Sequence, residues 1–157
     1  WDAAYPRIAT WAKLVRRSDG RRFLALNSHF DHVGQTARLE SARQIVRWIG
    51  ANRTPGETVL MTGDLNAERG TPPLVELTGP RLGLRDAKTV SKTPPVGPEG
   101  TFNNWVLVPR ETRRIDYVLT DPAVEVESYA VLAWHGEGGR PASDHFAVVA
   151  DVKACRK

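Results

Sequence analysis

Runs of apolar residues, alternating or continuous, predict most of the strands in this chain. The segments 8–15 and 22–30 are rich in β-branched and aromatic residues, and a Ser-Asp-Gly turn signal separates them, which predicts a β-hairpin. The segment 58–64 is mostly apolar and is predicted to be a strand buried on both faces. Three further strands are predicted near the end of the chain, over 113–120, 124–133 and 145–152.

Between the second and third of these strands, the apolar period lengthens to three and four residues. Apolar side chains recur at this spacing from Gln35 to about Asn52, with charged residues mostly on other faces, which predicts an amphipathic helix. Thr71 precedes a proline in the manner of a helix N-cap, which predicts a short helix over 72–78. The stretch 88–100 is rich in Pro, Thr and Gly and is expected to be an exposed loop.

Strands therefore dominate, with one long helix inserted among them. The sequence shows neither an internal repeat nor an interdomain linker, so the fold class is expected to be α/β (α+β) with a mixed sheet. A chain of 157 residues suits a single domain with one sizeable core.

Composition changes this picture only slightly. No run approaches the roughly 18 apolar residues of a membrane span, so we expect a soluble protein, either cytoplasmic or exported after removal of a signal. The net charge of +4 suits a phosphate-bearing substrate without requiring one. Lys and Arg are scattered and form no dense basic stripe, which makes nucleic-acid binding as the main task the weakest interpretation. The single cysteine, Cys155, excludes an internal disulfide framework.

Five polar clusters interrupt the hydrophobic pattern, most of them at or near a predicted strand boundary. Ligand sites form where strand ends meet loops. Asp and Asn oxygens are ligands for hard divalent cations, and histidine transfers protons near neutral pH. The clusters therefore predict a metal-assisted site. They are NSHFDH (27–32), GDLN (63–66), TFNNW (101–105), RRIDYV (113–118) and SDHF (143–146).

The GDLN cluster has a functional and a plainer interpretation. In extended backbone, residues i and i+2 point the same way, so Asp64 and Asn66 would face one pocket while Leu65 turns into the core. Gly63 would leave room for a ligand or metal to approach the backbone. The alternative is an ordinary turn, because Asp, Asn and Gly are common turn residues.

The other candidates also have structural alternatives. Asp116 lies within a run of strand formers, where a carboxylate is costly to bury unless it is paired or bound, although an edge-strand aspartate would give the same pattern. Asp144 and His145 stand in tandem before an apolar strand, where a polar loop is equally compatible. His29 ends a strand, and a lone histidine there is more often structural than catalytic.

Four further polar residues receive less weight. Asp31 and Gln35 are interpreted as part of the turn into the helix, and the role of His32 beside them is left open. His135 lies in a Gly-rich loop and receives no functional interpretation.

In order along the chain, the motifs contain His29 in NSHFDH, Asp64 and Asn66 in GDLN, Asp116 in RRIDYV, and Asp144 and His145 in SDH. This series resembles the endonuclease/exonuclease/phosphatase superfamily, the metal-dependent phosphoesterases that include DNase I and the exonuclease III type of abasic-site endonuclease. The resemblance implies a four-layer α/β/β/α sandwich with mixed β-sheets. Residues 1–157 would be a single domain of this type lacking its N-terminal part, which in the family supplies a metal-binding Glu.

The resemblance also implies roles for these residues. His29 would contact the scissile phosphate and stabilise charge or protonate the leaving group. Asp64 would orient or deprotonate the attacking water close to the metal, and Asn66 would hydrogen-bond a phosphate oxygen. Asp116 would pair with His145 and fix its tautomer and charge.

The same resemblance implies the cofactor and the substrate contacts. Asp144, together with Asp64, would bind Mg²⁺ or Mn²⁺, which neutralises charge on phosphoryl oxygens. Phe102 and Trp105 resemble the family's substrate-side aromatics and could stack on a base or sugar, with loop or core packing as the alternative.

The function implied is metal-dependent hydrolysis of a phosphodiester or phosphomonoester, with nucleic acid among the candidate substrates. The alternative is a truncated, non-catalytic relative that binds a phosphate ligand or a partner. Lack of the N-terminal part would leave apolar sheet surface uncovered, so we expect either that missing part or self-association to cover it.

Overall fold

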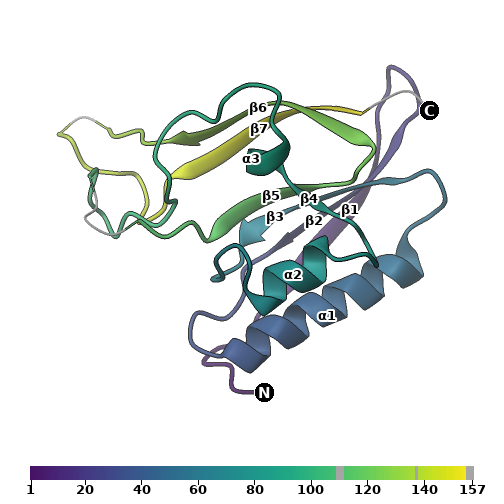
Figure 1. The fold of residues 1–157 in the computed structure, drawn as a ribbon, viewed down its shortest axis with the longest axis horizontal. Helices are drawn as coiled ribbons and strands as arrows, with labels where there is room; N and C mark the ends of the chain where they lie inside the picture. Colours follow the sequence, from purple (N-terminus) through teal and green to yellow (C-terminus); the bar gives the residue numbers. More distant parts are fainter. Residues whose placement is uncertain (109–111, 137, 155–157) are drawn as a thin grey trace.

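The computed structural model describes residues 1–108, 112–136 and 138–154, so Cys155 lies outside the described residues. The described residues form strands and helices in an α+β arrangement (Figure 1). The strands are β1 (Ala9–Val15), β2 (Arg22–Ser28), β3 (Thr58–Asp64), β4 (Arg85–Asp86), β5 (Asp116–Thr120), β6 (Val124–Leu132) and β7 (Ala147–Ala154). The helices are α1 (Gln35–Asn52), α2 (Pro72–Thr78) and α3 (Ala87–Val90).

Five of the strands form one sheet, in the spatial order β1-β2-β3-β5-β4. The hairpin predicted for the first two strands is confirmed, because β1 and β2 pair antiparallel. β2 and β3 pair parallel, as expected for strands joined by a helical crossover, here α1. β5 then pairs antiparallel with β3 and places Asp116 directly opposite Asp64. The predicted mixed sheet is therefore confirmed, and its register brings two candidate carboxylates together.

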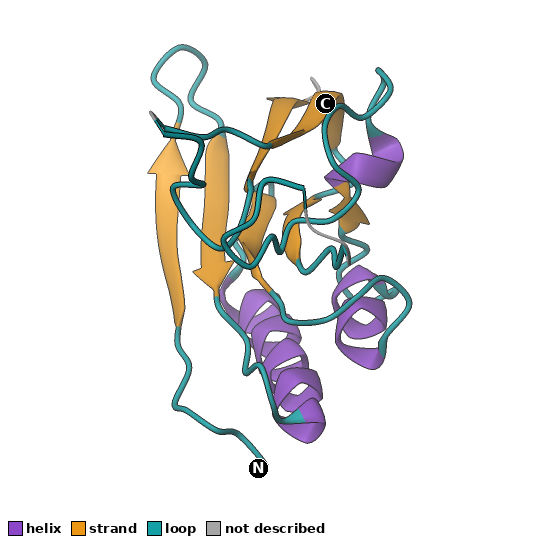
Figure 2. Ribbon diagram, turned by 90° about the vertical axis from the view of Figure 1, so that its left-hand side faces the viewer, coloured by secondary structure: helices purple, strands orange, loops and turns teal. Residues whose placement is uncertain are grey.

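Helices α1 and α2 cover one face of this sheet (Figures 1 and 2). The predicted bounds of both helices are confirmed. Thr71 occupies the N-cap position of α2, but its hydroxyl donates to the carbonyl of Glu68 instead of capping the helix. The apolar face of α1 packs on the sheet to form the main core, and full burial of each such aliphatic side chain contributes about 1.5–3 kcal/mol. The core residues from α1 are Ala42, Ile45, Val46 and Ile49, and those from the sheet include Leu24, Val59, Met61 and Leu119.

The strands β6 and β7 form a separate antiparallel pair, with α3 packed against it. Their core contains Val126, Tyr129 and Phe146, and Val118 of β5 packs on it from the first sheet. The loop prediction for 88–100 is wrong in part. Residues 87–90 form α3. Beyond this helix, Ser91 and Val96 form isolated β-bridges with β6. These bridges give the backbone polar groups of the segment hydrogen-bond partners beside a buried strand.

The prediction that β3 is buried on both faces is wrong. Val59 and Met61 face the helices and are fully buried, whereas Leu60 on the other face is only partly buried. No helix among the described residues covers that second face of β1–β3, which explains the difference.

The edge strand β1 is exposed along its whole length, including Trp11 (54% exposed) and Leu14 (51%). The occupant of this surface, whether a further part of the domain or a second copy, stays a prediction. Among the described residues, no helix combines the length and the apolar character needed to cross a bilayer.

Candidate functional site

At the end of β3, the chain turns and brings Asp64 and Asn66 into contact. The extended geometry predicted for this stretch is wrong, because Asn66 adopts a left-handed backbone conformation with φ 45°. Its backbone N–H donates to Asp64 Oδ1 (2.8 Å), and its side-chain amide donates to the carbonyl of Phe30 (3.0 Å). Leu65 is buried as predicted. The stretch is therefore a turn that also presents its carboxylate and amide on one side.

Gly63 has a different role from the one predicted. Its φ of 148° favours glycine, and a Cβ at this position would lie 2.9 Å from the carbonyl carbon of Ser28 and still closer to its oxygen. Glycine is thus required by the close approach of β2 to β3, with no need to invoke a ligand near the backbone.

The Asp116–His145 pair forms as the resemblance implies. Nδ1 of His145 lies 2.7 Å from Asp116 Oδ2, so a protonated Nδ1 donates to that carboxylate. Thr101 ties the two segments together, because its hydroxyl accepts from the Asp116 N–H and its carbonyl accepts from Phe146 N–H. These contacts hold His145 in front of β5, although the two residues are far apart in the sequence.

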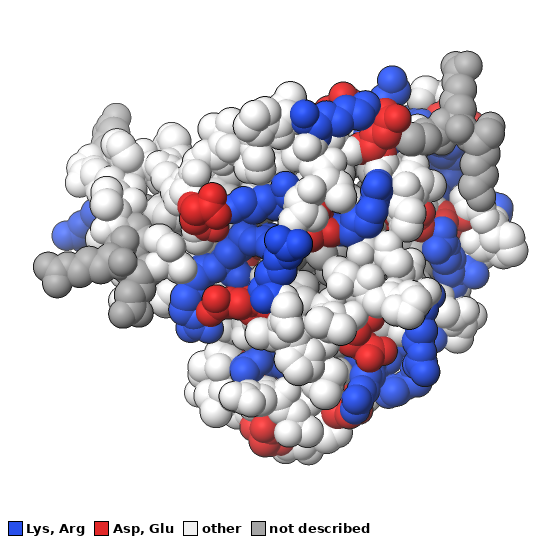
Figure 3. Space-filling view, in the orientation of Figure 1, with Lys and Arg blue, Asp and Glu red and all other residues white. Residues whose placement is uncertain are grey.

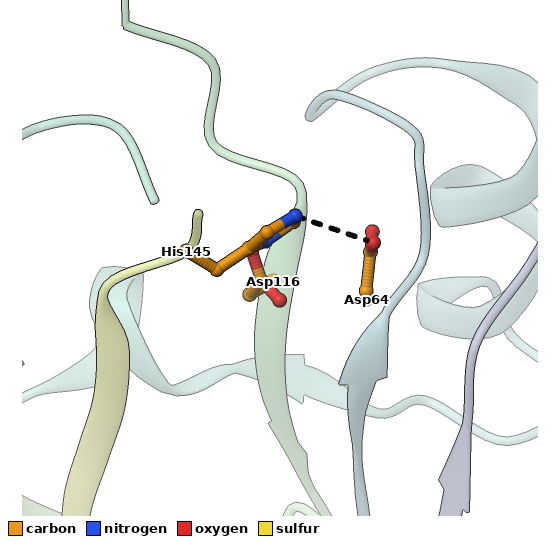
Figure 4. Close-up of side chains that lie close together, drawn as sticks. All are labelled: Asp64, Asp116 and His145. Atoms are coloured by element: carbon orange, nitrogen blue, oxygen red, sulfur yellow. Dashed lines mark hydrogen bonds and ion pairs between the residues drawn. The ribbon is translucent and has the colours of Figure 1, made fainter. Parts of the chain in front are cut away.

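The second ring nitrogen of His145, Nε2, points toward Asp64 (Figure 4). Nε2 of His145 lies 3.8 Å from Asp64 Oδ2, which is too long for a direct hydrogen bond. Asp64, Asp116 and His145 each offer one ligand atom, and the three atoms lie within 4.8 Å of one another. Among the described residues this is a group of side chains that could hold a metal ion.

The electrostatics of Asp64 fit a nearby cation. Burial raises the pKa of Asp64 above its ordinary value; the Asn66 N–H opposes this, the charge of Asp116 adds to it, and His29 and His145 also oppose it. A positive ion would relieve both the burial and the carboxylate repulsion, so the donor set of two carboxylates and an imidazole fits a divalent metal.

His29 follows β2 and lies beside the same carboxylate. Its Nε2 is 3.2 Å from Asp64 Oδ2, and its side chain is 55% exposed. Most of the predicted site residues line one cavity of about 360 Å³, whereas Asp116 and Trp105 are not in its lining. The predicted residues that line it are His29, Asp64, Asn66, Phe102, Asp144 and His145.

Asp144 and the aromatic residues occupy different positions relative to this cavity. The side chain of Asp144 accepts a hydrogen bond from Ser143 (3.3 Å) and lies outside the group of three ligand atoms, so its metal role stays a prediction. Phe102 meets the His145 ring edge-on at 5.2 Å, which is a packing contact on the cavity wall. Trp105 is 61% exposed, and its role in binding substrate also stays a prediction.

Sequence reasoning missed Arg7. It lines the cavity, and its buried Nε forms no hydrogen bond among the described residues but lies 3.8 Å from Asp31 Oδ1 as an ion pair. The Nη2 atom of Arg7 donates to Nδ1 of His32 (3.2 Å). Because Nδ1 accepts this hydrogen bond, the proton of neutral His32 is on Nε2. A lone arginine before a strand gives no signal of this contact, because the contact depends on the chain returning 25 residues later.

The structural interpretation of Asp31 agrees with its contacts. The side chain is 1% exposed and accepts hydrogen bonds from four backbone N–H groups. These hydrogen bonds lower the pKa of the Asp31 carboxyl, and the one from the Gly34 N–H lowers it most strongly. It thereby ties the N-terminal segment to the start of α1.

Comparison with known proteins places this geometry in a family. The model of the Endonuclease/Exonuclease/phosphatase family matches residues 4–145. The chain belongs to this family. The resemblance inferred from the motifs is therefore confirmed, as is the fold class. Enzymes of this family are mostly hydrolases and generally use divalent metals.

Solved structures of the endonuclease/exonuclease/phosphatase type share this fold. A mannosyl-6-phosphatase of Bacteroides thetaiotaomicron is 29% identical with a TM-score of 0.85, and the match covers 98% of this chain and 59% of that one. A family protein of Bacteroides vulgatus is 33% identical with a TM-score of 0.86, covering 98% and 58%. TDP2 of D. rerio, complexed with a single-stranded DNA product, shares the fold at 18% identity and a TM-score of 0.71, covering 94% and 62%.

The chain thus spans about three-fifths of the length of the structures it matches. No functionally curated protein matches the sequence.

Proposed function

We propose that this protein is a divalent-metal-dependent phosphoesterase that hydrolyses a phosphodiester or phosphomonoester by attack of water. The observation that carries the proposal is the arrangement of Asp116, His145 and Asp64 on two neighbouring strands and an adjoining loop, beside a cavity that Arg7 and His29 also line. An orienting carboxylate, an imidazole and a second, partly buried carboxylate are the groups that water attack on a phosphate requires.

The distances between Asp116, His145 and Asp64 indicate a role for each residue. Asp116 accepts from Nδ1–H of His145 and so fixes the ring and its tautomer. Nε2 then faces Asp64 across 3.8 Å, and an oxygen atom about 2.8 Å from each would fit between them. That oxygen is the attacking water, which can donate a hydrogen bond to each of them. Asp64 orients and deprotonates the water.

The remaining groups bind the phosphate. His29 lies 3.2 Å from Asp64 and can donate to a phosphoryl or leaving-group oxygen. Asn66 lines the same cavity, and so does Arg7, whose guanidinium pairs with Asp31 through Nε. A guanidinium beside the cavity can donate a charge-assisted hydrogen bond to a phosphate.

The proposed function also requires a divalent metal ion. Asp64 and Asp144 would hold Mg²⁺ or Mn²⁺, whose charge stabilises the phosphoryl oxygens and the leaving group. The residues of this chain would then bind the phosphate, orient the attacking water and transfer protons beside the metal. We also propose that the chain is one part of a single domain of this family, since it spans about three-fifths of the related structures.

One observation favours a second candidate. Of the two carboxylates proposed to hold the metal, Asp144 lies outside the group of ligand atoms that the described residues bring together around Asp64. A relative that binds a phosphate ligand without turning it over is therefore the alternative.

The test uses purified protein with bis-p-nitrophenyl phosphate, DNA and sugar phosphates, with Mg²⁺, Mn²⁺ or EDTA. We expect metal-dependent release that EDTA abolishes and that His145→Ala lowers by at least 100-fold. His135→Ala is the matched control, because this histidine is exposed, lies outside the cavity lining, and its ring contacts the carbonyl of its neighbour Gly136. Product release that EDTA does not inhibit, or equal activity of His145→Ala and His135→Ala, overturns the proposal. Phosphate binding without any turnover establishes the alternative.

A further inference from the structure

One asparagine that the proposed mechanism does not use, Asn103, is fully buried beside the segment that carries His145. It lies in the loop 101–105 and is 0% exposed. Its side-chain Nδ2 donates to the carbonyl of Ser143 (3.1 Å), and its backbone N–H donates to the carbonyl of Asp144 (2.8 Å). Asn103 therefore binds both of the peptide groups that lead into His145.

The same side chain also holds its own loop in an unusual backbone conformation. Asn104 and Trp105 both have positive φ, at 51° and 65°, and this left-handed region is a clear exception for a residue as bulky as Trp. Oδ1 of Asn103 accepts from the Trp105 N–H (2.7 Å) and stabilises this turn. Within the turn, the Asn104 N–H is a second donor to the carbonyl of Asp144 (3.1 Å). One carboxamide thus fixes both the loop and the segment that the loop contacts.

The position of the His145 ring depends on the backbone that carries it. Residues 142–144 are bends outside any strand, so the hydrogen bonds of a sheet ladder do not fix them. Nδ1 of His145 lies 2.7 Å from Asp116 Oδ2, and its Nε2 lies 3.8 Å from Asp64 Oδ2. Both distances change when the peptide group before His145 rotates. A misplacement of about 1 Å in a reacting group can lower a rate by about 100-fold.

We propose that Asn103 is a positioning residue for the proposed hydrolysis, because its carboxamide fixes the peptide groups before His145 and so holds the imidazole between Asp116 and Asp64. This role rests on the proposed function, and Asn103 itself does not line the catalytic cavity. The amide suits the task because it donates and accepts at once, whereas an ionised aspartate only accepts. An aspartate here would set a carboxylate oxygen against the carbonyl of Ser143.

The decisive variant is Asn103→Ala, and the matched control is Asn104→Gly. The control removes the exposed neighbouring carboxamide, and glycine adopts the positive φ without strain and keeps the N–H that donates to Asp144. Kinetics use whichever of bis-p-nitrophenyl phosphate, DNA and sugar phosphates the wild type hydrolyses fastest, with Mg²⁺. We expect kcat to fall about 100-fold in Asn103→Ala and to stay at the wild-type value in the control. Far-UV circular dichroism at the assay temperature checks that each variant is folded.

A second variant separates the two contacts of the carboxamide. Asn103→Asp keeps an acceptor for the Trp105 N–H but loses the donor to Ser143. Its kcat should fall as in Asn103→Ala, with little change in KM, because the lost contact is the one to the segment of His145. Wild-type kcat in folded Asn103→Asp overturns the inference.

A double-mutant cycle tests whether Asn103 acts through His145. In the His145→Ala background, Asn103→Ala should have little further effect on kcat, because the imidazole that it positions is gone. An asparagine that merely stabilises the fold would lower activity by the same factor in both backgrounds. An equal factor in the two backgrounds therefore overturns the inference while the hydrolytic function stands.

A measurement without turnover separates this inference from the proposed function. Long-range ¹H–¹⁵N NMR spectra report which ring nitrogen of a neutral histidine carries the proton, and the His145 signals are assigned by their loss in His145→Ala. The wild type and Asn104→Gly should show the Nδ1–H form that donates to Asp116, and Asn103→Ala should show a mixture of the two tautomers. If the wild type hydrolyses nothing, the proposed function fails. Unchanged His145 signals in Asn103→Ala would then overturn the positioning role as well.

Discussion

Gly63 is the position where a single methyl group tests both the fold and the site. Its φ of 148° is a region that L side chains rarely adopt, which costs about 1–3 kcal/mol for alanine. The added Cβ would also lie 2.9 Å from the carbonyl carbon of Ser28, a backbone atom that cannot rotate away. Overpacking of this kind adds about 1–3 kcal/mol. We therefore expect Gly63→Ala to lower the free energy of unfolding by about 2–6 kcal/mol.

Gly20 provides the matched control. Its φ of 72° is also positive, but a Cβ there would meet nothing within 4 Å, so Gly20→Ala carries only a backbone cost of about 1–2 kcal/mol. For a chain of this size, 1 kcal/mol corresponds to about 2–4 °C in Tm. Far-UV circular dichroism on heating should show Gly63→Ala melting about 10 °C below the wild type and Gly20→Ala about 4 °C below it.

Equal melting temperatures for the two variants would refute the reasoning, because the β2–β3 approach would then tolerate a Cβ. Activity gives a second readout, since Asp64 directly follows Gly63. At a temperature where both variants are folded, Gly63→Ala should lose more activity than Gly20→Ala.

Three further predictions concern the site and its support. Asp116→Asn should lower kcat by about 100-fold or more with little change in KM, because the imidazole loses its orienting carboxylate; steady-state kinetics showing mainly a KM effect would contradict this. Arg7→Ala should raise KM for a phosphate ester about 10-fold, with partial recovery in Arg7→Lys, and unchanged kinetics would rule out phosphate binding by Arg7. The fold lowers the pKa of Asp31 below 3.8, so its stabilisation is present above that pH and is lost as the pH falls below it. The fall in Tm between pH 6 and pH 3 should therefore be smaller in Asp31→Asn than in the wild type, and an equal fall in both would contradict this stabilisation.

Features encoded within a few neighbouring residues could be predicted closely. The helix at 35–52 follows from its apolar period, the short helix at 72–78 from a threonine before prolines, and the hairpin from a turn between two strand-forming runs. The candidate residues His29, Asp64, Asn66, Asp144 and His145 could be selected from the order of their motifs, which resembles the family, whereas each motif alone left a structural alternative open.

The sequence by itself thus determined most of the elements and the family, and it supplied the candidate residues of the site. The tertiary structure alone decided the geometry, because contacts between distant residues have no local signature. Register placed Asp116 opposite Asp64, and the close approach of β2, not a ligand, explains Gly63. Arginines that look scattered along the chain line two adjoining hollows, because α1, the segments on either side of α2 and the segment before β5 lie side by side. Figure 3 shows basic side chains gathered on the face that α1 and α2 present, with acidic side chains between them. Packing over long sequence separations sets these neighbours, and it therefore sets the surface that a substrate would meet.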